Sequence, residues 1–412
     1  MSNESLIISP NAYQAGAILG HRPSSADATK VIPIEIPFTR NSTAMRRNSA
    51  GLWESVSNNV PRLHYPVGGG CPSWLFEAEA TNVVLNSLGN AATYSVAGGS
   101  SLSDFSLSTP FSGVTSAIKV STIANFFSGC SKTISRASAI NVNWCIVKKS
   151  TLDYMGMVDI TGGGVVAWFN ISNGTLGTVN AGYTARITSE GDGWYRCELT
   201  KNTADAAAVF QIMFTNTDNS SIGAVGDSYL CFAQNELGSA ATSPIITAGA
   251  AVTRLADNVS KTGASEIIGQ TEGTIFVDVV INSENNPSAN IINGAKNTNS
   301  SFAILRIKAT KAIRAFIYNS TVLKANITGG SYNLGDRLKI AYAYKSGDSV
   351  LYVNGVQIGT SADAISFPAT LSELNWDDAT TYFGYQEAEN INETRISKTR
   401  LPNAELAALT TI

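Results

Sequence analysis

The chain has 412 residues, of which 44% are hydrophobic and only 14% are charged, with a formal net charge of −3. The slight acidic excess excludes charge-driven, non-specific binding to nucleic acid, and no apolar run reaches the roughly 18 residues of a membrane span. The N-terminal stretch MSNESLIISPN lacks the basic start of a signal peptide, so we expect none, and the length predicts two or three domains.

The first part of the chain, residues 1–82, holds seven of the twelve prolines. Proline removes a backbone donor and resists central strands, so we expect extended segments and turns with one short strand over residues 31–36. Such a segment cannot bury a core of its own. We therefore predict an arm that anchors the protein and lies either on the next domain or on a neighbouring subunit.

The rest of the chain consists of short β-type runs separated by clusters of Gly, Asn, Asp and Ser, which is typical of sandwiches and barrels. We predict an all-β fold in which the arm is followed by two β-sandwich domains, over residues 83–257 and 258–412. In the run 194–199, alternation places Tyr195, Cys197 and Leu199 on one face, which we favour as the inner one.

Two turns and one helix punctuate these domains. Glu190-Gly191-Asp192-Gly193 and Asn354-Gly355 each lie between apolar runs, which predicts β-hairpins. A short helix is expected over residues 403–409, with Asn403 as its cap.

The cysteine and histidine counts limit the possible chemistry. The five cysteines are an odd number without a CxxC pair, so we expect reduced and mostly buried thiols at Cys71, Cys130, Cys145, Cys197 and Cys231. The two histidines, His21 and His64, both lie in the first part of the chain. They leave almost no room for histidine-based metal sites or a Ser-His-Asp triad, and we expect no enzyme.

The N-terminal part contains SLIISPNAYQAG, FTRNSTAMRRNSAGLWESVSNNVPRLHY and GGCPSWLFEAEATNVVLNS. These stretches resemble the first segment of phage and prophage tail or fibre proteins, in which TR-x-S-T-A, N-x-x-G, NVPR and CPSLLLE followed by TNLL recur. Trp74 and Phe76 replace leucines of that pattern, and Arg46-Arg47 precedes its asparagine. The residues that match it are Arg40, Asn48, Gly51, Arg62, Cys71, Glu77 and Asn82.

Further stretches resemble parts of the same phage proteins. GDGWYRCEL, which contains Trp194, and CFAQNELGSAATSPIITAGAAVTRLAD resemble the end of a carbohydrate-binding-module-like jelly roll. GDRLKIAYAYKSGDSVLYVNGVQIG, with Asn354 and Gly355, and the closing RISKTRLPNAELAALT are similar to concanavalin A/laminin G-like sandwiches. The resemblance implies a virion protein in a fibre, spike or decoration, and it implies no particular ligand.

Aromatic side chains are the first candidates for glycan binding, because an exposed ring stacks on the apolar face of a sugar. We select Trp168, Trp194 and Trp376, with Asp377 and Asp378 beside the last. The alternative is that each tryptophan packs in the core.

Paired carboxylates and calcium ligands give weaker signals. Asp377 and Asp378 are adjacent and point to opposite faces of a strand, and Glu387 and Glu389 lie in a polar, loop-like run, so we expect no glycoside hydrolysis. No cofactor is expected. Calcium is the one metal considered, with oxygen ligands from Asp218, Asn219, Asp377 and Asp378.

These observations predict a phage virion structural protein, a fibre or a head or tail decoration, that displays glycan-binding-type domains for attachment to a host surface. We expect it to be made in the bacterial cytoplasm and to bind other virion proteins and a bacterial surface glycan. It is expected to form a homo-oligomer, in the first place a homotrimer. The alternatives are a structural virion component without a ligand and a polysaccharide depolymerase.

Overall fold

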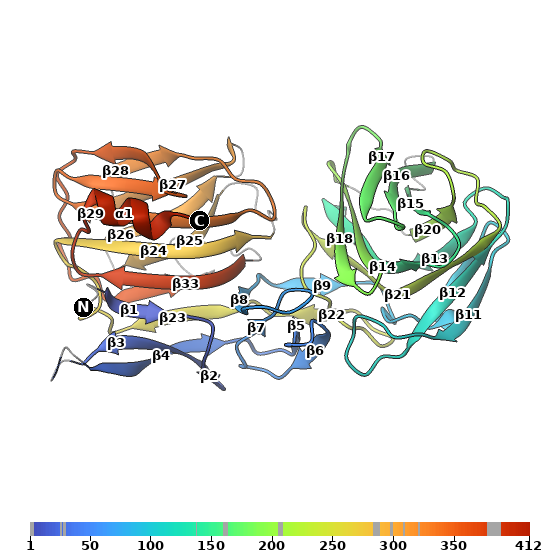
Figure 1. The fold of residues 1–412 in the computed structure, drawn as a ribbon, viewed down its shortest axis with the longest axis horizontal. Helices are drawn as coiled ribbons and strands as arrows, with labels where there is room; N and C mark the ends of the chain where they lie inside the picture. The colour runs from blue at the N-terminus through green and yellow to red at the C-terminus, as the bar shows by residue number, and fades with distance from the viewer. Residues whose placement is uncertain are drawn as a thin grey trace.

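The computed structural model describes residues 4–24, 27, 30–136, 138–159, 164–204, 209–282, 289–296, 300–307, 310–319, 322–376 and 389–412. These residues form two β-sandwiches that are joined by a segment of short strands (Figure 1). The all-β prediction is confirmed. In the described part of the chain, no helix is long and apolar enough to cross a membrane.

The middle sandwich consists of two antiparallel sheets with six strands each. The first has the order β10 (Ser95–Ala97), β13 (Gly129–Thr133), β20 (Val209–Thr215), β15 (Tyr154–Asp159), β16 (Gly164–Asn170) and β17 (Thr175–Val179). The second has the order β11 (Ser101–Ser106), β12 (Ser116–Thr122), β21 (Gly226–Leu237), β14 (Asn141–Lys149), β19 (Trp194–Lys201) and β18 (Tyr183–Gly191). Cys145, Phe169 and Phe214 lie in the core between the sheets.

The predicted hairpin at residues 190–193 joins β18 and β19 and is confirmed. Cys197 and Leu199 point into the core of the middle sandwich, as favoured from the sequence. The opposite face of β19 is buried as well, because Trp194 packs there with Met45 and Trp53 of the N-terminal part of the chain. Period-two alternation identified the inner face but not the second layer that covers the outer one.

The C-terminal sandwich has two antiparallel sheets that meet along one edge. The first sheet has the order β31 (Val356–Ser361), β30 (Ser349–Val353), β29 (Arg337–Lys345), β24 (Glu272–Ile281), β33 (Glu389–Ser397), β1 (Glu4–Ile8) and β3 (Ala17–Pro23). The second has the order β28 (Val322–Gly329), β27 (Ala312–Asn319), β26 (Ser300–Ile307), β25 (Ala289–Lys296), β32 (Glu373–Trp376), β23 (Asn258–Thr262) and β4 (Val31–Thr39). Pairing between β3 and β4 joins the two sheets, and the short strand β2 (Tyr13–Gln14) pairs with the start of β3.

The N-terminal arm therefore differs from the expectation, because three of its strands complete the C-terminal sandwich of the same chain. Leu6, Ile36 and Phe38 lie in that core and are at most 1% exposed. The prolines of β4, Pro33 and Pro37, alternate with these inward residues and are exposed. The proline content suggested extended chain, but Pro33 and Pro37 occupy only the outer positions of a regular strand.

Short strands form a junction segment (residues 40–82) between the two sandwiches (Figure 1). They are β5 (Ala44–Arg47), β6 (Trp53–Val56), β7 (Leu63–His64), β8 (Ser73–Phe76) and β9 (Ala80–Asn82). β8 adds to β33 of the C-terminal sandwich, and β9 pairs with β22 (Val252–Arg254), which follows the middle sandwich. The junction segment thus contacts both sandwiches. A 3-10 turn, η1 (Ala91–Thr93), begins the middle sandwich.

The chain ends in the helix α1 (Asn403–Thr410), which packs on the first sheet of the C-terminal sandwich through Leu406. The helix was predicted, but its cap was not: Pro402 holds the cap position and Asn403 is the first helical residue. Proline suits this place because it has no backbone donor to leave unsatisfied.

Gly355→Ala is expected to lower the free energy of unfolding by about 1 kcal/mol. The Asn354-Gly355 hairpin is confirmed between β30 and β31, with φ values of 50° and 80° that define a tight turn suited to glycine. A methyl group at Gly355 would also lie 3.3 Å from Oγ1 of Thr411. Urea denaturation measures the change. Asn354→Asp, which keeps both the acceptor and the turn preference, is the control and should change stability by less than about 0.5 kcal/mol.

Candidate functional site at the junction of the two sandwiches

Three arginines and two carboxylates form a buried ion network where the junction segment meets the two sandwiches. Arg62 donates to Glu77 at 2.5 Å and also to Asp257. Arg40 donates to Asp257 at 2.9 Å, and Arg254 donates to Glu77. All five side chains are at most 2% exposed. The network joins positions that are up to 217 residues apart in the sequence.

Hydrogen bonds to the main chain complete the network. Glu77 accepts from the backbone nitrogen of Ser243 at 2.7 Å and from its hydroxyl at 2.6 Å. The backbone nitrogen of Glu77 donates to Asp257 at 2.9 Å. Burial alone would raise the pKa of Glu77, but the charges of Arg254 and Arg62 hold it well below its ordinary value. The carboxylate is thus charged, and removing it would leave buried guanidinium groups without a partner.

Arg40, Arg62 and Glu77 are residues that the phage-like motifs singled out, and Arg254 and Asp257 lie in the matching TRLAD stretch. The sequence marked them as separate motifs, and the structure brings them into one network. One signal in the sequence could have predicted this network. The chain has few charged residues, and its motifs contain both arginines and acidic residues, which could have suggested that these residues form ion pairs with one another.

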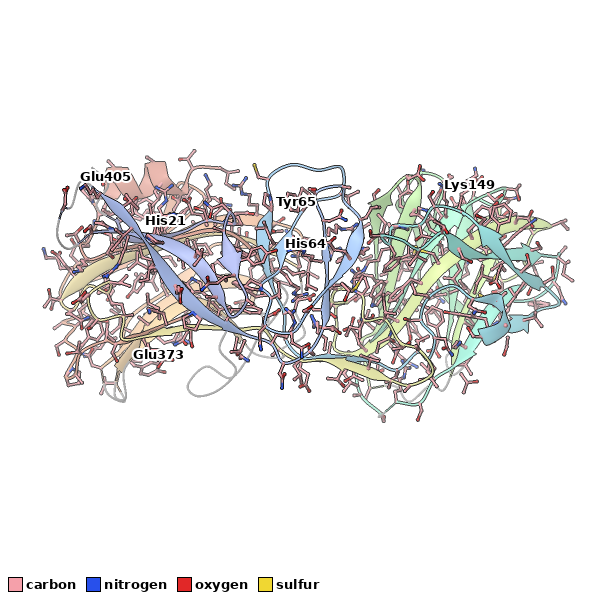
Figure 2. The ribbon with its side chains drawn as sticks, turned by 90° about the horizontal axis from the view of Figure 1, so that it is seen from below. His21, His64, Tyr65, Lys149, Glu373 and Glu405 are labelled. Atoms are coloured by element: carbon pink, nitrogen blue, oxygen red, sulfur yellow. The ribbon has the colours of Figure 1, made fainter. Side chains whose placement is uncertain are left out.

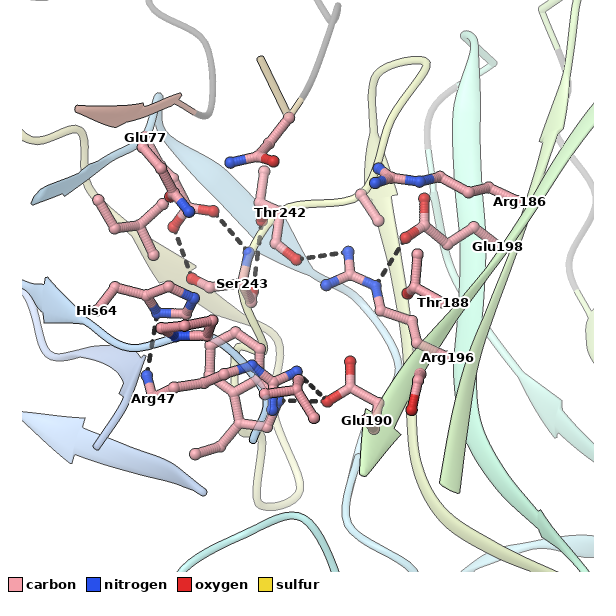
Figure 3. A pocket seen from close by; sticks show the side chains of 18 residues that line it. Arg47, His64, Glu77, Arg186, Thr188, Glu190, Arg196, Glu198, Thr242 and Ser243 are labelled. Atoms are coloured by element: carbon pink, nitrogen blue, oxygen red, sulfur yellow. Dashed lines mark hydrogen bonds and ion pairs between the residues drawn. The ribbon is translucent and has the colours of Figure 1, made fainter. Parts of the chain in front are cut away.

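A cavity of about 270 Å³ lies beside this network, and all three parts of the chain line it (Figure 3). Arg47 and His64 come from the junction segment, Arg186 and Glu190 come from β18, and Asn390 comes from β33. Figure 2 places His64 and Tyr65 between the two sandwiches. We call this space the junction cavity.

One wall of the junction cavity is fixed by an ion pair between Arg47 and Glu190. Glu190 also accepts from Nε1 of Trp53 at 2.8 Å, and the Arg47 guanidinium lies 4.3 Å from the centre of the Trp53 ring. The backbone nitrogen of Arg47 donates to Nδ1 of His64 at 3.0 Å (Figure 3). These contacts tie the junction segment to the β18–β19 hairpin.

The opposite wall is built around Arg196 on β19. Its Nε lies 2.8 Å from Glu198, and Nη2 donates to the carbonyl oxygen of Thr242 at 2.9 Å (Figure 3). The guanidinium also lies 4.0 Å from the centre of the Trp144 ring, whose Nε1 donates to Glu236 at 3.1 Å. Arg196 is therefore held in place and has its charge partner within the protein.

A second space of about 610 Å³, which we call the open groove, adjoins the junction cavity along the C-terminal sandwich. The two spaces share His64, Pro66 and Asn390 among their lining residues. Farther along the groove, Arg337 donates two hydrogen bonds to Asp278, at 2.8 and 2.6 Å. The junction cavity and the open groove therefore adjoin one another, and charged and polar side chains line both.

Acid is expected to destabilise the protein below pH 6.5 because of His64. Burial, together with the positive charges of Arg47 and Arg62, lowers the pKa of His64 to about 3. The unfolded chain takes up a proton near pH 6.5 and the folded chain does not, so stability is lost as the pH falls, by up to about 1.4 kcal/mol per pH unit. Urea denaturation between pH 7 and 4.5 measures this slope.

His64→Gln should flatten that slope, since the glutamine side chain at position 64 does not take up a proton when the chain unfolds. His21→Gln, which leaves His64 in place, should keep the wild-type slope. Equal slopes for His64→Gln and the wild type would contradict the assignment.

The three tryptophans selected from the sequence are all buried. Trp168 is 2% exposed and donates to the carbonyl oxygen of Ser220 at 2.9 Å, and Trp194 is 1% exposed. Trp376 is 2% exposed and donates to Oγ1 of Thr394 at 3.1 Å. Their indoles pack in hydrophobic clusters, so the core alternative describes them, and none offers an exposed face to a sugar. Asp377 and Asp378 lie outside the described residues.

The calcium candidates within the described residues serve local structure. Asp218 accepts from the backbone nitrogen and the hydroxyl of Thr178, at 2.9 and 3.0 Å, and Asn219 adopts a left-handed turn conformation. No group of three or more His, Cys, Asp or Glu side chains suited to a metal ion occurs in the part of the chain that the structure describes.

The remaining motif residues have structural positions. Asn48 accepts from the backbone nitrogens of Ala50 and Leu52, which closes the turn that contains Gly51 at φ 77°. Asn82 is buried and donates to the carbonyl oxygen of Ile245 at 2.8 Å.

The cysteines follow the expectation of free and mostly buried thiols. Cys130, Cys145, Cys197 and Cys231 are buried, and Cys71 is exposed at the edge of the open groove. Burial raises the pKa of the Cys130 thiol to about 12 and raises those of the other three well above their ordinary value. These four thiols are protonated at neutral pH and are not nucleophiles.

No protein family matches the sequence, and no curated protein is significantly similar to it. Among solved structures, a pentraxin from Limulus polyphemus is similar over 33% of this chain and 68% of its own, at 10% identity and a TM-score of 0.28. A fourth domain of an extracellular arabinanase from Geobacillus stearothermophilus, in complex with arabinotriose, is similar over 42% and 81%, at 16% identity and a TM-score of 0.30.

A sialidase from Streptococcus pneumoniae is similar over 37% of this chain, at 13% identity and a TM-score of 0.30, and the chain spans only 26% of that protein. The structural neighbours thus include sugar-binding and sugar-cleaving proteins. At these TM-scores and identities, the likeness carries no argument about what this chain binds.

Proposed function

We propose that the protein is a structural component of a phage particle, a fibre or a head or tail decoration, that attaches to a bacterial surface glycan at its junction site. The observation that carries the attachment role is the pair of adjoining concave sites, the junction cavity and the open groove, both of which are lined by charged and polar side chains. Sugars are recognised by convergent amides, carboxylates and guanidinium groups in such concave sites.

The virion role is supported by the motifs that resemble phage proteins. Arg40, Arg62 and Glu77 from the first segment meet Arg254 and Asp257 from the second in one buried network. The resemblance therefore concerns residues that depend on one another in the fold, which favours a shared architecture over chance similarity.

We further propose that the protein binds other virion proteins and forms a homo-oligomer, in the first place a trimer, on the particle. The arm is not an argument for this assembly, because its strands β1, β3 and β4 are buried against their own chain. What supports it is the resemblance to fibre proteins and the advantage of several copies, since weak single contacts add up to avid attachment.

We propose attachment without hydrolysis. The carboxylates that line the junction cavity and the open groove each form an ion pair with an arginine; they are Glu77, Glu190, Glu198, Asp278 and Glu393. A glycosidase needs one carboxyl group that stays protonated as the general acid, and a neighbouring guanidinium opposes protonation. A component without a ligand is the second candidate, favoured by the burial of all six tryptophans.

A bacterial glycan array with the protein displayed multivalently tests this function. We expect binding that is weakened by Asn390→Ala at the junction site and unchanged by Asn326→Ala on β28, which lies outside it. Absence of binding to every glycan would favour the component without a ligand. Shortening of a bound polysaccharide over time would identify a depolymerase.

A further inference from the structure

Every arginine and glutamate that lines the junction cavity has an ion-pair partner among the described residues, except one arginine. Arg47 is paired with Glu190, Arg196 with Glu198, and Glu77 with two arginines of the buried ion network. That network itself contains three arginines and two carboxylates, so it adds positive rather than negative potential to the cavity.

Arg186 is the cavity arginine that has no ion pair or side-chain hydrogen bond among the described residues. It lies on β18, opposite Glu198 on β19, and its side chain is only partly buried. Its guanidinium extends toward the C-terminal sandwich, since a Cβ built on Gly335 would lie 3.8 Å from Nη2. Figure 3 shows the group beside the cavity with no interaction drawn to it. An unpaired guanidinium at a confined site is suited to bind a carboxylate.

Asn390 supplies the second observation. It lies on β33, where the junction cavity and the open groove meet, and its Oδ1 is buried without a hydrogen-bond partner in the described structure. Buried polar atoms are nearly always satisfied, so the orphaned Oδ1 of this lining residue marks a hydrogen bond for which the described protein provides no donor. A hydroxyl group is such a donor.

We propose that the junction cavity binds an acidic sugar, with Arg186 contacting its carboxylate and Asn390 accepting from one of its hydroxyls. A carboxylate and hydroxyls on one ring match the two unsatisfied groups, and the volume of about 270 Å³ suits one sugar ring. This inference rests on the proposed glycan attachment and names the class of glycan. Neighbouring rings of the same polymer would continue into the open groove.

The test uses oligosaccharides that contain hexuronic or sialic acids, each paired with its carboxyl-reduced form, and the full-length protein. Titration calorimetry should show that an acidic oligosaccharide binds at least tenfold more tightly than its reduced form, because a charge-assisted hydrogen bond contributes ~1.5–3 kcal/mol. Arg186→Gln should remove this difference. Arg22→Gln, which removes the same charge from the exposed end of β3, should keep it.

Folding does not confound this comparison, since Arg186 has no ion pair or side-chain hydrogen bond to lose among the described residues, and thermal unfolding of both variants checks the point. Equal binding of the acidic and reduced forms, or unchanged binding by Arg186→Gln, would overturn the acidic-sugar inference while leaving attachment intact. Preference for a phosphodiester-linked glycan would overturn the carboxylate assignment. If no oligosaccharide of either form bound, the acidic-sugar inference would fail, and the glycan array would decide separately whether attachment fails with it.

Discussion

Glu77→Gln is expected to lower the free energy of unfolding by about 3–5 kcal/mol, because it leaves Arg254 buried with no acidic partner. Glu77 is also the acceptor for both polar groups of Ser243, so the substitution weakens the main-chain contact between the junction segment and the middle sandwich. Urea denaturation followed by tryptophan fluorescence measures the loss.

The control for this experiment is Asp192→Asn in the exposed pair with Lys148, where Asp192 is 77% exposed. Asparagine tolerates the positive φ of that turn, so the change should cost less than about 1 kcal/mol. A loss as small as this for Glu77→Gln would show that the buried ion network contributes little to stability.

Deletion of residues 1–39 is expected to unfold the C-terminal sandwich, because it removes strands β1, β3 and β4 from both of its sheets. The deletion would expose core residues such as Ile396 and Val259, which now pair with Leu6 of β1 and Phe38 of β4. Limited proteolysis should then cut within residues 258–412 at protease concentrations that leave the wild type intact.

A point variant isolates the packing contribution of these strands. Phe38 is 1% exposed in the same core, and Phe38→Ala should cost about 3–5 kcal/mol. Val31→Ala on the same strand is the control, since Val31 is 67% exposed and its loss should matter little. If the truncated chain resisted proteolysis as well as the wild type and were as stable, the N-terminal strands would contribute little to the stability of the C-terminal sandwich.

The parts of the fold that depend on neighbouring residues could be predicted from the sequence. The hairpins at residues 190–193 and at Asn354-Gly355 follow from local turn preferences, and the inward side of β19 follows from alternation. The pairing of β1 with β33 could not be predicted this way. It joins Glu4 to Ser397, and no local preference specifies a partner so far along the chain.

The candidate site was harder to predict for a related reason. The sequence around a tryptophan in a strand, such as Trp168, does not show whether its ring is exposed or buried. Here the ring is buried, and its Nε1 donates to the carbonyl oxygen of Ser220. Conversely, nothing in the sequence distinguishes Arg186 from the other Lys and Arg residues, of which the chain has 28 in all. Only the pairing of the surrounding charges distinguishes it.

The pairing of β9 with β22 has a consequence for how this chain can vary. Residues Ala80–Asn82 lead into the middle sandwich and Val252–Arg254 lead out of it, and the two strands lie side by side. The middle sandwich is thus an insertion whose entry and exit points adjoin, within a domain whose own strands come from both ends of the chain. Insertions are tolerated where their ends meet. A different module could occupy this place while the host domain keeps its strand register, provided that the module also covers Met45 and Trp53, which now pack on Trp194 of the middle sandwich.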